Sequence, residues 1–333
     1  MAIHPPYLLF LGDITDSTAA KTAKGIAEWR PDWAQAQCRL PGCAADLGLP
    51  DLTPAKAAEA GIKTLIVGVA NSGGILPDHW LNTLEDALDH GLDIASGLHR
   101  RLRDIPRLRD KAKALGRTLT DVRYPDVVYP VGNGQKRSGK RVLMVGTDCS
   151  VGKMFTALAI TKALQEQVQK ATFRATGQTG IFIAGDGVPV DAVIADFISG
   201  AVETLTPDND ADHWDVIEGQ GSLFHPSFAA VTLGLIHGAQ ADALILCAAP
   251  RPHMRHLPNY PVPSFDACID LYQTTARLTN PAATVVGISV NTSAMDEAEA
   301  RRYLGEVEQQ YTMPATDPYR FGAQPLADAL LNR

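Results

Sequence analysis

Residues 146–154 are the part of this sequence whose residue types and spacing most clearly indicate chemistry. Two glycines enclose a polar loop that ends in Gly-Lys, with an apolar run at 142–145 before it and residues of helical composition after it. A strand, a glycine-bounded loop and a helix in this order form a phosphate-binding loop. The loop N–H groups and the helix N-terminus attract an anion, and the Lys153 ammonium adds a full positive charge.

We therefore expect this loop to bind the phosphate of a cofactor. The residues predicted to do so are Gly146, Thr147, Asp148, Cys149, Ser150, Val151, Gly152, Lys153 and Met154. A chance glycine-rich turn is the alternative, and the strand before the loop and the helix after it argue against that interpretation.

Two features of the loop depart from the usual pattern. Five residues rather than four separate Gly146 from Gly152, a spacing that resembles the loops of dethiobiotin-synthetase-like proteins. Met154 occupies the place of the Ser or Thr hydroxyl that normally binds Mg²⁺. Because a thioether is a poor ligand for a hard cation, we expect neither Mg²⁺ nor another metal at this loop.

A second group of reactive side chains follows the short segment Asp215-Val216-Ile217. The strand predicted there delivers Glu218 to its carboxyl end, where Gly219 and Gly221 allow a sharp turn. In folds with a phosphate-binding loop this strand lies beside the loop, so the carboxylate faces phosphates or metal. His225 places an imidazole nearby, suited to proton transfer near neutral pH. A solvated carboxylate and a structural histidine are the alternatives.

Two further segments offer groups for a small polar substrate. Gln178 and Thr179 lie between two glycines, which predicts a hydrogen-bonding platform. Arg251 and Arg255 lie in the proline-rich segment 250–264 and could clamp carboxylates or phosphates in a bidentate manner. A surface loop with solvated charges explains the arginines equally well.

Short apolar strands that alternate with helices must position these residues, and this rhythm predicts parallel α/β sheets. In the first half we expect strands at 7–11, 64–69, 92–95 and 118–122, with helices at 19–29, 77–90 and 107–115. In the second half we expect strands at 142–145, 171–175, 215–218, 243–248 and 284–290, with helices from 154, at 191–201 and at 297–310.

The segment 124–140 is rich in Pro, Gly, Asn and charge, which is typical of a domain boundary. We expect a Rossmann-like parallel sheet at 1–136 and a P-loop NTPase-like, three-layer α/β/α domain at 137–333. The turns Gly12-Asp13 and Gly73-Gly74 follow strands of the first domain, but the chain has no GxGxxG motif. Structural turns are therefore favoured there over a dinucleotide site.

Composition narrows the class of protein. The 333 residues are 45% hydrophobic and 20% charged, which is ordinary globular material sufficient for two cores. The net charge of −7 and the absence of a long basic run argue against nucleic acid as a partner. The five cysteines form no CxxC pair, the apolar runs are of strand size, and residues 1–6 lack a basic signal-peptide region. We expect a cytoplasmic protein that has no membrane partner and forms a homo-oligomer.

Several motifs together resemble one protein family, long a domain of unknown function, that includes D-glutamate N-acetyltransferases. The motifs lie at 146–154, 176–180, 217–226, 253–258 and 316–322, with shorter ones at 97–99 and 121–123. The resemblance covers nearly the whole chain. It implies a Rossmann-like domain, a P-loop domain and acetyl-CoA-dependent N-acetylation of a D-amino acid. Met154 agrees with that reaction, because breaking a thioester needs no Mg²⁺.

The predicted reaction is therefore acyl transfer to a small-molecule amino acid. The loop would anchor coenzyme A, Glu218 or His225 would take a proton from the substrate ammonium, and backbone N–H groups would stabilise the oxyanion. Arg251 or Arg255 would hold the carboxylates. One alternative is an ATP- and Mg²⁺-dependent ligase of dethiobiotin-synthetase type, with Glu218 as a metal ligand. A non-catalytic metabolite sensor is the other.

Overall fold

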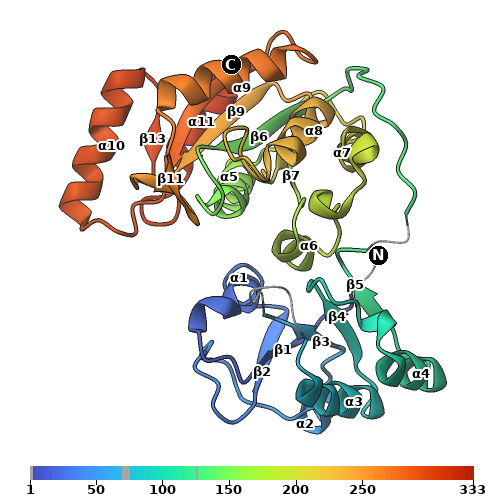
Figure 1. Ribbon diagram of the computed structural model, residues 1–333. Coiled ribbons are helices and arrows are strands. Elements are labelled where there is room, and N and C mark those ends of the chain that lie inside the picture. The colour runs from blue at the N-terminus through green and yellow to red at the C-terminus, as the bar shows by residue number, and fades with distance from the viewer. Residues whose placement is uncertain (1–2, 70–75, 125–126) are drawn as a thin grey trace. The chain divides into compact units, whose positions relative to one another are not determined.

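The computed structural model describes residues 3–69, 76–124 and 127–333, so the turn expected at Gly73-Gly74 lies outside the described residues. The chain forms two compact units (Figure 1). The N-terminal unit comprises Met1–Val127 and Gln178–Ala192, and the P-loop unit comprises Val128–Gly177 and Val193–Arg333. Segment 178–192 thus leaves the P-loop unit and belongs to the N-terminal unit.

The N-terminal unit is built on a parallel sheet in the order β2-β1-β3-β4-β5. Its strands are β1 (Tyr7–Gly12), β2 (Ala34–Arg39), β3 (Thr64–Val67), β4 (Asp93–Ser96) and β5 (Leu119–Asp121). The four predicted strands all form. Strand β2 was not predicted, because its sequence, Ala-Gln-Ala-Gln-Cys-Arg, has no apolar run and is held by pairing with the buried β1.

The N-terminal unit also contains helices, and one of them comes from the middle of the chain. They are α1 (Lys21–Trp29), α2 (Pro54–Glu59), α3 (Leu81–Asp89), α4 (Pro106–Leu115) and α6 (Gln178–Ala184). Helix α6 packs against α1, and the ion pair of Arg123 with Asp191 joins the end of segment 178–192 to the same unit (Figure 1). Among the described residues, no helix is long and apolar enough to cross a membrane.

The P-loop unit has a parallel sheet in the order β13-β12-β9-β6-β8-β7 and a separate antiparallel hairpin. The sheet contains β6 (Lys140–Gly146), β7 (Ala171–Arg174), β8 (Trp214–Ile217), β9 (Ala243–Ala248), β12 (Thr284–Val290) and β13 (Ala315–Thr316). The hairpin consists of β10 (His253–Met254) and β11 (Leu257–Pro261). Strand β6 therefore lies between β8 and β9, and the segments that follow these three strands begin at one edge of the sheet.

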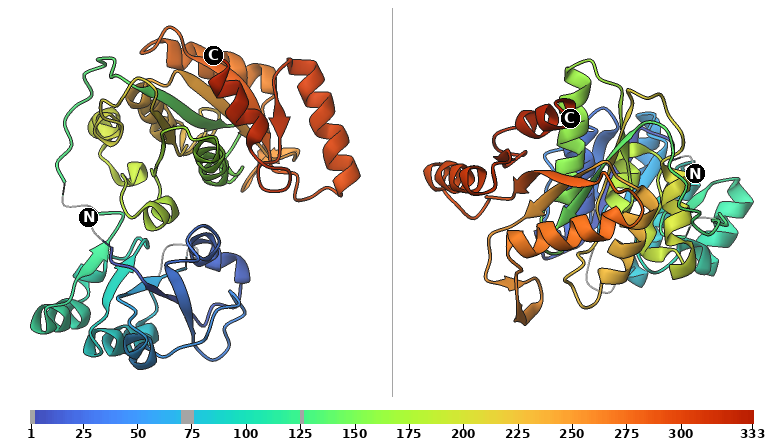
Figure 2. Two further views of the ribbon diagram at one scale, coloured as in Figure 1. Left: turned by 180° about the vertical axis from the view of Figure 1, so that it is seen from behind. Right: turned by 90° about the horizontal axis from the view of Figure 1, so that it is seen from above.

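Helices lie on both faces of this second sheet (Figure 2). They are α5 (Lys153–Glu166), α7 (Ile198–Leu205), α8 (Ala229–Ala239), α9 (Phe265–Arg277), α10 (Glu297–Tyr311) and α11 (Gln324–Leu331). Val142 and Met144 of β6 point into a core shared with α5 and α11. Because side chains alternate along a strand, Leu143 and Val145 are buried on the opposite face, the side of α8 and α9.

The prediction of two α/β domains with parallel sheets, the second in three layers, is confirmed. The helix predicted at 191–201 is wrong in its extent. The structure has two single 3₁₀ turns there, Val190–Ala192 and Ala195–Phe197, before α7 begins at Ile198. Pro189 and the short polar residues of this segment favour turns over a continuous helix.

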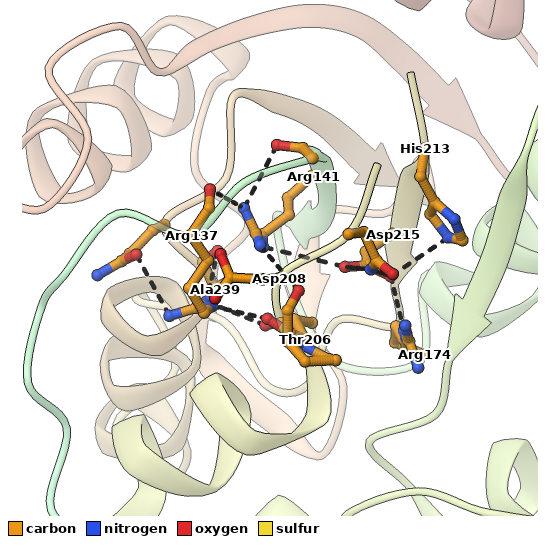
Figure 3. A network of polar contacts seen from close by, with 12 residues as sticks. Arg137, Arg141, Arg174, Thr206, Asp208, His213, Asp215 and Ala239 are labelled. Carbon is orange, nitrogen blue, oxygen red and sulfur yellow. Dashed lines mark hydrogen bonds and ion pairs between the residues drawn. The ribbon is translucent and has the colours of Figure 1, made fainter. Parts of the chain in front are cut away.

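Part of the segment predicted as a linker is fixed to the P-loop unit by the half-buried Arg137 and the buried Arg141 (Figure 3). Arg141, fully buried at the start of β6, donates to the carbonyl oxygens of Arg137 (3.0 Å), Ser138 (2.8 Å) and Pro207 (3.1 Å). The Arg137 guanidinium in turn donates to the carbonyl oxygen of Thr206 at 2.6 Å. These bonds make residues 137–141 an ordered edge of the unit.

Candidate active site

The loop between β6 and α5 has the backbone of an anion-binding turn. Thr147 N–H donates to the Cys247 carbonyl at 3.0 Å, which continues the pairing of β6 with β9. Ser150 (φ 53°) and Gly152 (φ 96°) then adopt left-handed conformations that reverse the chain. No side chain of the described residues caps α5 at Gly152, so the N–H groups of its first turn remain for a ligand.

Lys153, the first residue of α5, is folded back into the loop. Its side chain is only 7% exposed, and Nζ donates to the carbonyl oxygen of Asp148 at 2.8 Å. Burial lowers the pKa of this ammonium. A side chain on Gly146 would place a Cβ 3.1 Å from Nζ, so this glycine leaves the room that the lysine occupies. A bound anion would therefore meet a charge that is already in place and poorly solvated.

Asp148 joins this loop to the proline-rich segment after β9. The carboxylate is fully buried and accepts from its neighbour Cys149 N–H, from Arg251 Nη2 and from Arg255 N–H, each at 2.6 Å. Arg251 Nη2 also donates to the Cys149 carbonyl at 2.8 Å. Much of the Arg251 guanidinium is thus engaged in holding two loops together.

The Arg255 side chain differs from that of Arg251. It is exposed, and its Nε donates to His256 Nε2 at 3.2 Å. The guanidinium therefore retains donors that can reach an anion. Of the two arginines predicted to clamp a carboxylate, Arg255 has the exposed guanidinium and Arg251 the one that holds two loops together, and a substrate role for either stays a prediction.

Glu218 is brought next to the phosphate-binding loop by β8. The side chain is 4% exposed, and its Oε2 accepts from the N–H groups of Thr176 (2.9 Å) and Gly177 (3.1 Å), while Oε1 accepts from Gln220 Nε2 (3.1 Å). Burial raises the pKa of this carboxyl to about 7, although the three donors act in the opposite direction. A carboxyl group with this pKa can accept and return a proton at neutral pH.

Gly219 explains how Glu218 comes so close to the loop. A Cβ at this position would lie 1.7 Å from the Met144 carbonyl oxygen and 2.8 Å from Lys153 Cδ. Only glycine allows the turn after β8 to pass directly over β6 and the lysine stem.

His225 lies on the same side of the loop. Its ring is buried, stacks on Phe228 with 4.6 Å between the ring centroids, and accepts at Nδ1 from Ser227 N–H at 3.2 Å. A neutral imidazole that accepts at Nδ1 carries its hydrogen on Nε2. The Nδ1 atom of His225 is therefore engaged as an acceptor, and a catalytic role for this residue stays a prediction.

Three side chains here have the chemistry of metal ligands. Potential ligand atoms of Asp148, Cys149 and His225 all lie within 4.8 Å of one another. However, the Asp148 carboxylate already bonds the Arg251 guanidinium, whose positive charge opposes a cation beside it. Burial also raises the pKa of the Cys149 thiol, which disfavours the thiolate that a metal needs. The expectation of no metal at this loop stays a prediction.

Gln178 and Thr179 lie in the N-terminal unit, in the first turn of α6. Thr179 Oγ1 is 3.1 Å from Thr22 Oγ1. With its amide oriented to satisfy both neighbours, Gln178 donates to the Gly97 carbonyl (2.6 Å) and accepts from Arg123 (3.2 Å). The loop platform predicted from the flanking glycines is instead a helical turn, and its polar side chains serve contacts within the unit. A substrate role for these two residues stays a prediction.

One residue that holds the site together was not found from the sequence. Tyr272, on α9, donates from its hydroxyl to the Gly146 carbonyl at 2.7 Å and accepts from Leu223 N–H at 3.1 Å. It thereby fixes the loop that carries His225 against the phosphate-binding loop. No sequence motif predicts this role, because a tyrosine in an amphipathic helix has the same pattern as a residue of the hydrophobic core.

The raised pKa of Glu218 predicts a pH-dependent stability. Between about pH 4.5 and pH 7 the folded protein keeps a proton that the unfolded chain has lost, so the free energy of unfolding falls as pH rises through this window. The change is about 3 kcal/mol at 1.36 kcal/mol per pKa unit. Glu218→Gln keeps the neutral form at every pH. We therefore expect urea unfolding to show the wild type losing this stability relative to the variant as pH rises, and a constant difference would contradict the assignment.

Comparison with known proteins agrees with this architecture. The P-loop domain of the DUF1611 family, described as a domain of unknown function, matches residues 130–327, and the Rossmann-like domain of that family matches residues 38–125. The structure of a DUF1611 family protein from Anabaena variabilis has a TM-score of 0.88 and 33% identity, over 99% of this chain and 100% of that one. These matches confirm the family resemblance predicted from the motifs.

Two curated relatives extend along nearly the whole chain. A D-glutamate N-acetyltransferase of Tritonibacter scottomollicae is 59% identical over 329 residues, which cover 98% of this chain and 99% of the relative. A D-glutamate N-acetyltransferase of a Pseudoalteromonas species is 47% identical over 327 residues, 98% of either chain.

Proposed function

The chain belongs to the DUF1611 family, and from that premise we propose that it is a D-glutamate N-acetyltransferase that takes its acetyl group from acetyl-CoA. The two full-length relatives that bear the name of this reaction support the acceptor and the reaction type. The single observation that supports the donor is the loop itself. It keeps the glycines, the helix N-terminus and Lys153, yet has Met154 where a nucleotide-hydrolysing enzyme needs a hydroxyl.

In this proposal the loop anchors a phosphate of coenzyme A. Lys153 Nζ donates to the Asp148 carbonyl, a neutral acceptor that a phosphate oxygen outcompetes because charge-assisted hydrogen bonds are about twice as strong. The N–H groups of the first turn of α5 complete the anion site. In this proposal the loop binds the acetyl donor through its phosphate and takes no part in phosphoryl transfer.

Glu218 is the proposed general base. In its ionised form it takes a proton from the substrate ammonium, and the freed amine attacks the thioester carbonyl. The tetrahedral intermediate carries a negative oxygen, for which His225 Nε2–H is a suitable donor together with backbone N–H groups. The C–N bond forms in this attack. Collapse of the intermediate then breaks the C–S bond, and the second ammonium proton passes from the nitrogen to the departing sulfur, which leaves the amide and the coenzyme A thiol. Glu218 returns its proton to solvent.

Recognition of the amino acid needs positive charge, because D-glutamate carries two carboxylates. Arg255 is the proposed partner, since its exposed guanidinium retains free donors, and Arg251 keeps the loop of Arg255 in place through Asp148. Gln178 and Thr179 remain candidates for further contacts. We place the reaction in the cytoplasm, consistent with five free cysteines, and keep the prediction of a homo-oligomer.

The rival function is an ATP- and Mg²⁺-dependent ligase in which Glu218 would bind the metal. Met154 counts against it, because the first ligand of such a metal is an oxygen at this position. The hydrogen bonds of Glu218 also count against it, since Thr176 and Gly177 N–H already use one carboxylate oxygen.

The deciding experiment is thiol release from acetyl-CoA with D-glutamate as acceptor and L-glutamate as control, in excess EDTA. We expect full activity with EDTA, because a thioester needs no metal to develop charge on its carbonyl oxygen. Met154→Thr, which restores the hydroxyl, should leave the rate no higher. Loss of activity in EDTA with rescue by Mg²⁺ would falsify the proposal and favour the ligase.

A further inference from the structure

A cavity of about 440 Å³ lies in the P-loop unit beside the phosphate-binding loop. Its walls come from Thr147 of that loop, the residues that follow β9, the start of α9 and one side of α10. Nothing in the proposed reaction so far uses this space, although it begins at a residue of the loop itself.

The walls of this cavity combine apolar and polar surface in about equal measure. Ala249, Val262, Phe265 and Val307 form much of the lining, and Tyr303 and Tyr311 add aromatic surface. Glu306 is the one carboxylate among the lining residues, and the one guanidinium, that of Arg251, is already bonded to Asp148. The volume is in the range that suits a drug-sized ligand rather than a single amino acid.

Two buried polar atoms border the cavity without a hydrogen-bond partner among the described residues. One is Oγ1 of Thr147, whose side chain is fully buried, and the other is Nε of Arg251. A buried polar atom that is left unsatisfied is costly, and such atoms in native proteins are usually paired. Both atoms belong to residues of the cavity wall, so a ligand there that carries polar groups can supply the missing bonds if these two side chains turn toward it.

We propose that this cavity holds the pantetheine arm of acyl-coenzyme A, an inference that rests on the proposed function. The arm is long and largely aliphatic, and its two amides and one hydroxyl can pair with Thr147 Oγ1 and Arg251 Nε. The arm is joined directly to the diphosphate of coenzyme A. A ligand whose diphosphate binds at the loop can therefore extend its arm past Thr147 into the cavity.

The same features disfavour the other candidate occupants. D-Glutamate carries three charges, and the cavity offers it no unpaired guanidinium. An adenine ring needs a flat slot between parallel surfaces, whereas the rings of Phe265 and Tyr311 are tilted by 60° with centroids 5.7 Å apart. The cavity therefore fits the arm better than the nucleotide end of coenzyme A.

Filling the cavity tests the inference. Ala249→Trp places an indole at a half-buried position of the cavity wall, where it excludes the arm. If the arm can no longer bury even two of its methylene groups, binding weakens about tenfold. We expect calorimetry to show acetyl-CoA binding weaker by about tenfold or more. The affinity for 3′,5′-ADP, which has phosphates but no arm, should not change. The matched control is Ala298→Trp, at an exposed position of α10 outside the cavity, which should bind both ligands as the wild type does.

The outcomes separate the inference from the proposed function. If Ala249→Trp binds acetyl-CoA as the wild type does, or loses 3′,5′-ADP affinity to the same extent, the arm does not lie here. If the wild type itself binds no acetyl-CoA, the proposed function fails and the inference with it. Should Ala249→Trp not fold, Thr147→Val decides. Because this variant lacks the Thr147 hydroxyl, its affinity for acetyl-CoA should fall about 2- to 12-fold, while its affinity for 3′,5′-ADP should not change. A variant that binds acetyl-CoA as tightly as the wild type does would overturn the inference.

Discussion

Glu218→Gln is expected to lower kcat for acetyl transfer by about 10²–10⁴-fold, the usual cost of removing a general base. Binding of acetyl-CoA should remain close to that of the wild type. Glutamine fills the same space and can still accept from the N–H groups of Thr176 or Gly177, but it cannot take a proton from the substrate ammonium. Steady-state kinetics with D-glutamate and calorimetry with acetyl-CoA measure the two effects separately.

The matched control is Glu203→Gln. Glu203 is also a buried carboxylate that accepts from backbone N–H groups, those of Asn133 (3.0 Å) and Gly134 (2.9 Å), in the same unit and outside the phosphate-binding loop. It should retain kcat even if it loses some stability. Equal losses in both variants would mean that the effect comes from the fold. Recovery of Glu218→Gln activity on adding Mg²⁺ would assign Glu218 to a metal instead.

Much of the phosphate-binding loop was predictable because its function depends on backbone geometry, which glycine spacing and flanking elements record directly. The loop, β6 before it and α5 after it all lie where the sequence predicted them. The close approach of Glu218 to this loop was also predictable, since a strand end followed by glycines has few alternatives. Local sequence was sufficient wherever the local backbone determined the geometry.

The remaining features depend on contacts between segments distant in sequence, and these were not predictable. The pKa of Glu218 follows from burial, which no local pattern encodes. The use of Arg251 as a support of the loop depends on a contact with Asp148, 103 residues earlier. Helix α6 belongs to the N-terminal unit although its sequence lies inside the second half of the chain. A motif records which residues are present but not which of them already bind one another.

Lys153→Ala is expected to weaken acetyl-CoA binding by about 10- to 150-fold. That range corresponds to the loss of about 1.5–3 kcal/mol, typical of a hydrogen bond to a charged group. The effect should be large because the ammonium is desolvated before the ligand arrives: its side chain is 7% exposed and its pKa is lowered by burial. Little of the attraction is therefore spent on removing water from the lysine.

The fold should survive this substitution. The hydrogen bond that Lys153 Nζ donates in the structure goes to the Asp148 carbonyl of the same loop, so its loss breaks no contact with another part of the chain. Lys162→Ala is the matched control, since Lys162 lies on the same helix, is exposed and pairs loosely with Glu166. Calorimetry should give Lys162→Ala the wild-type Kd, and thermal unfolding should show both variants folded. An unchanged Kd in Lys153→Ala would remove the phosphate anchor from the mechanism. The loop would then have no role in binding the cofactor, and coenzyme A would have to bind elsewhere.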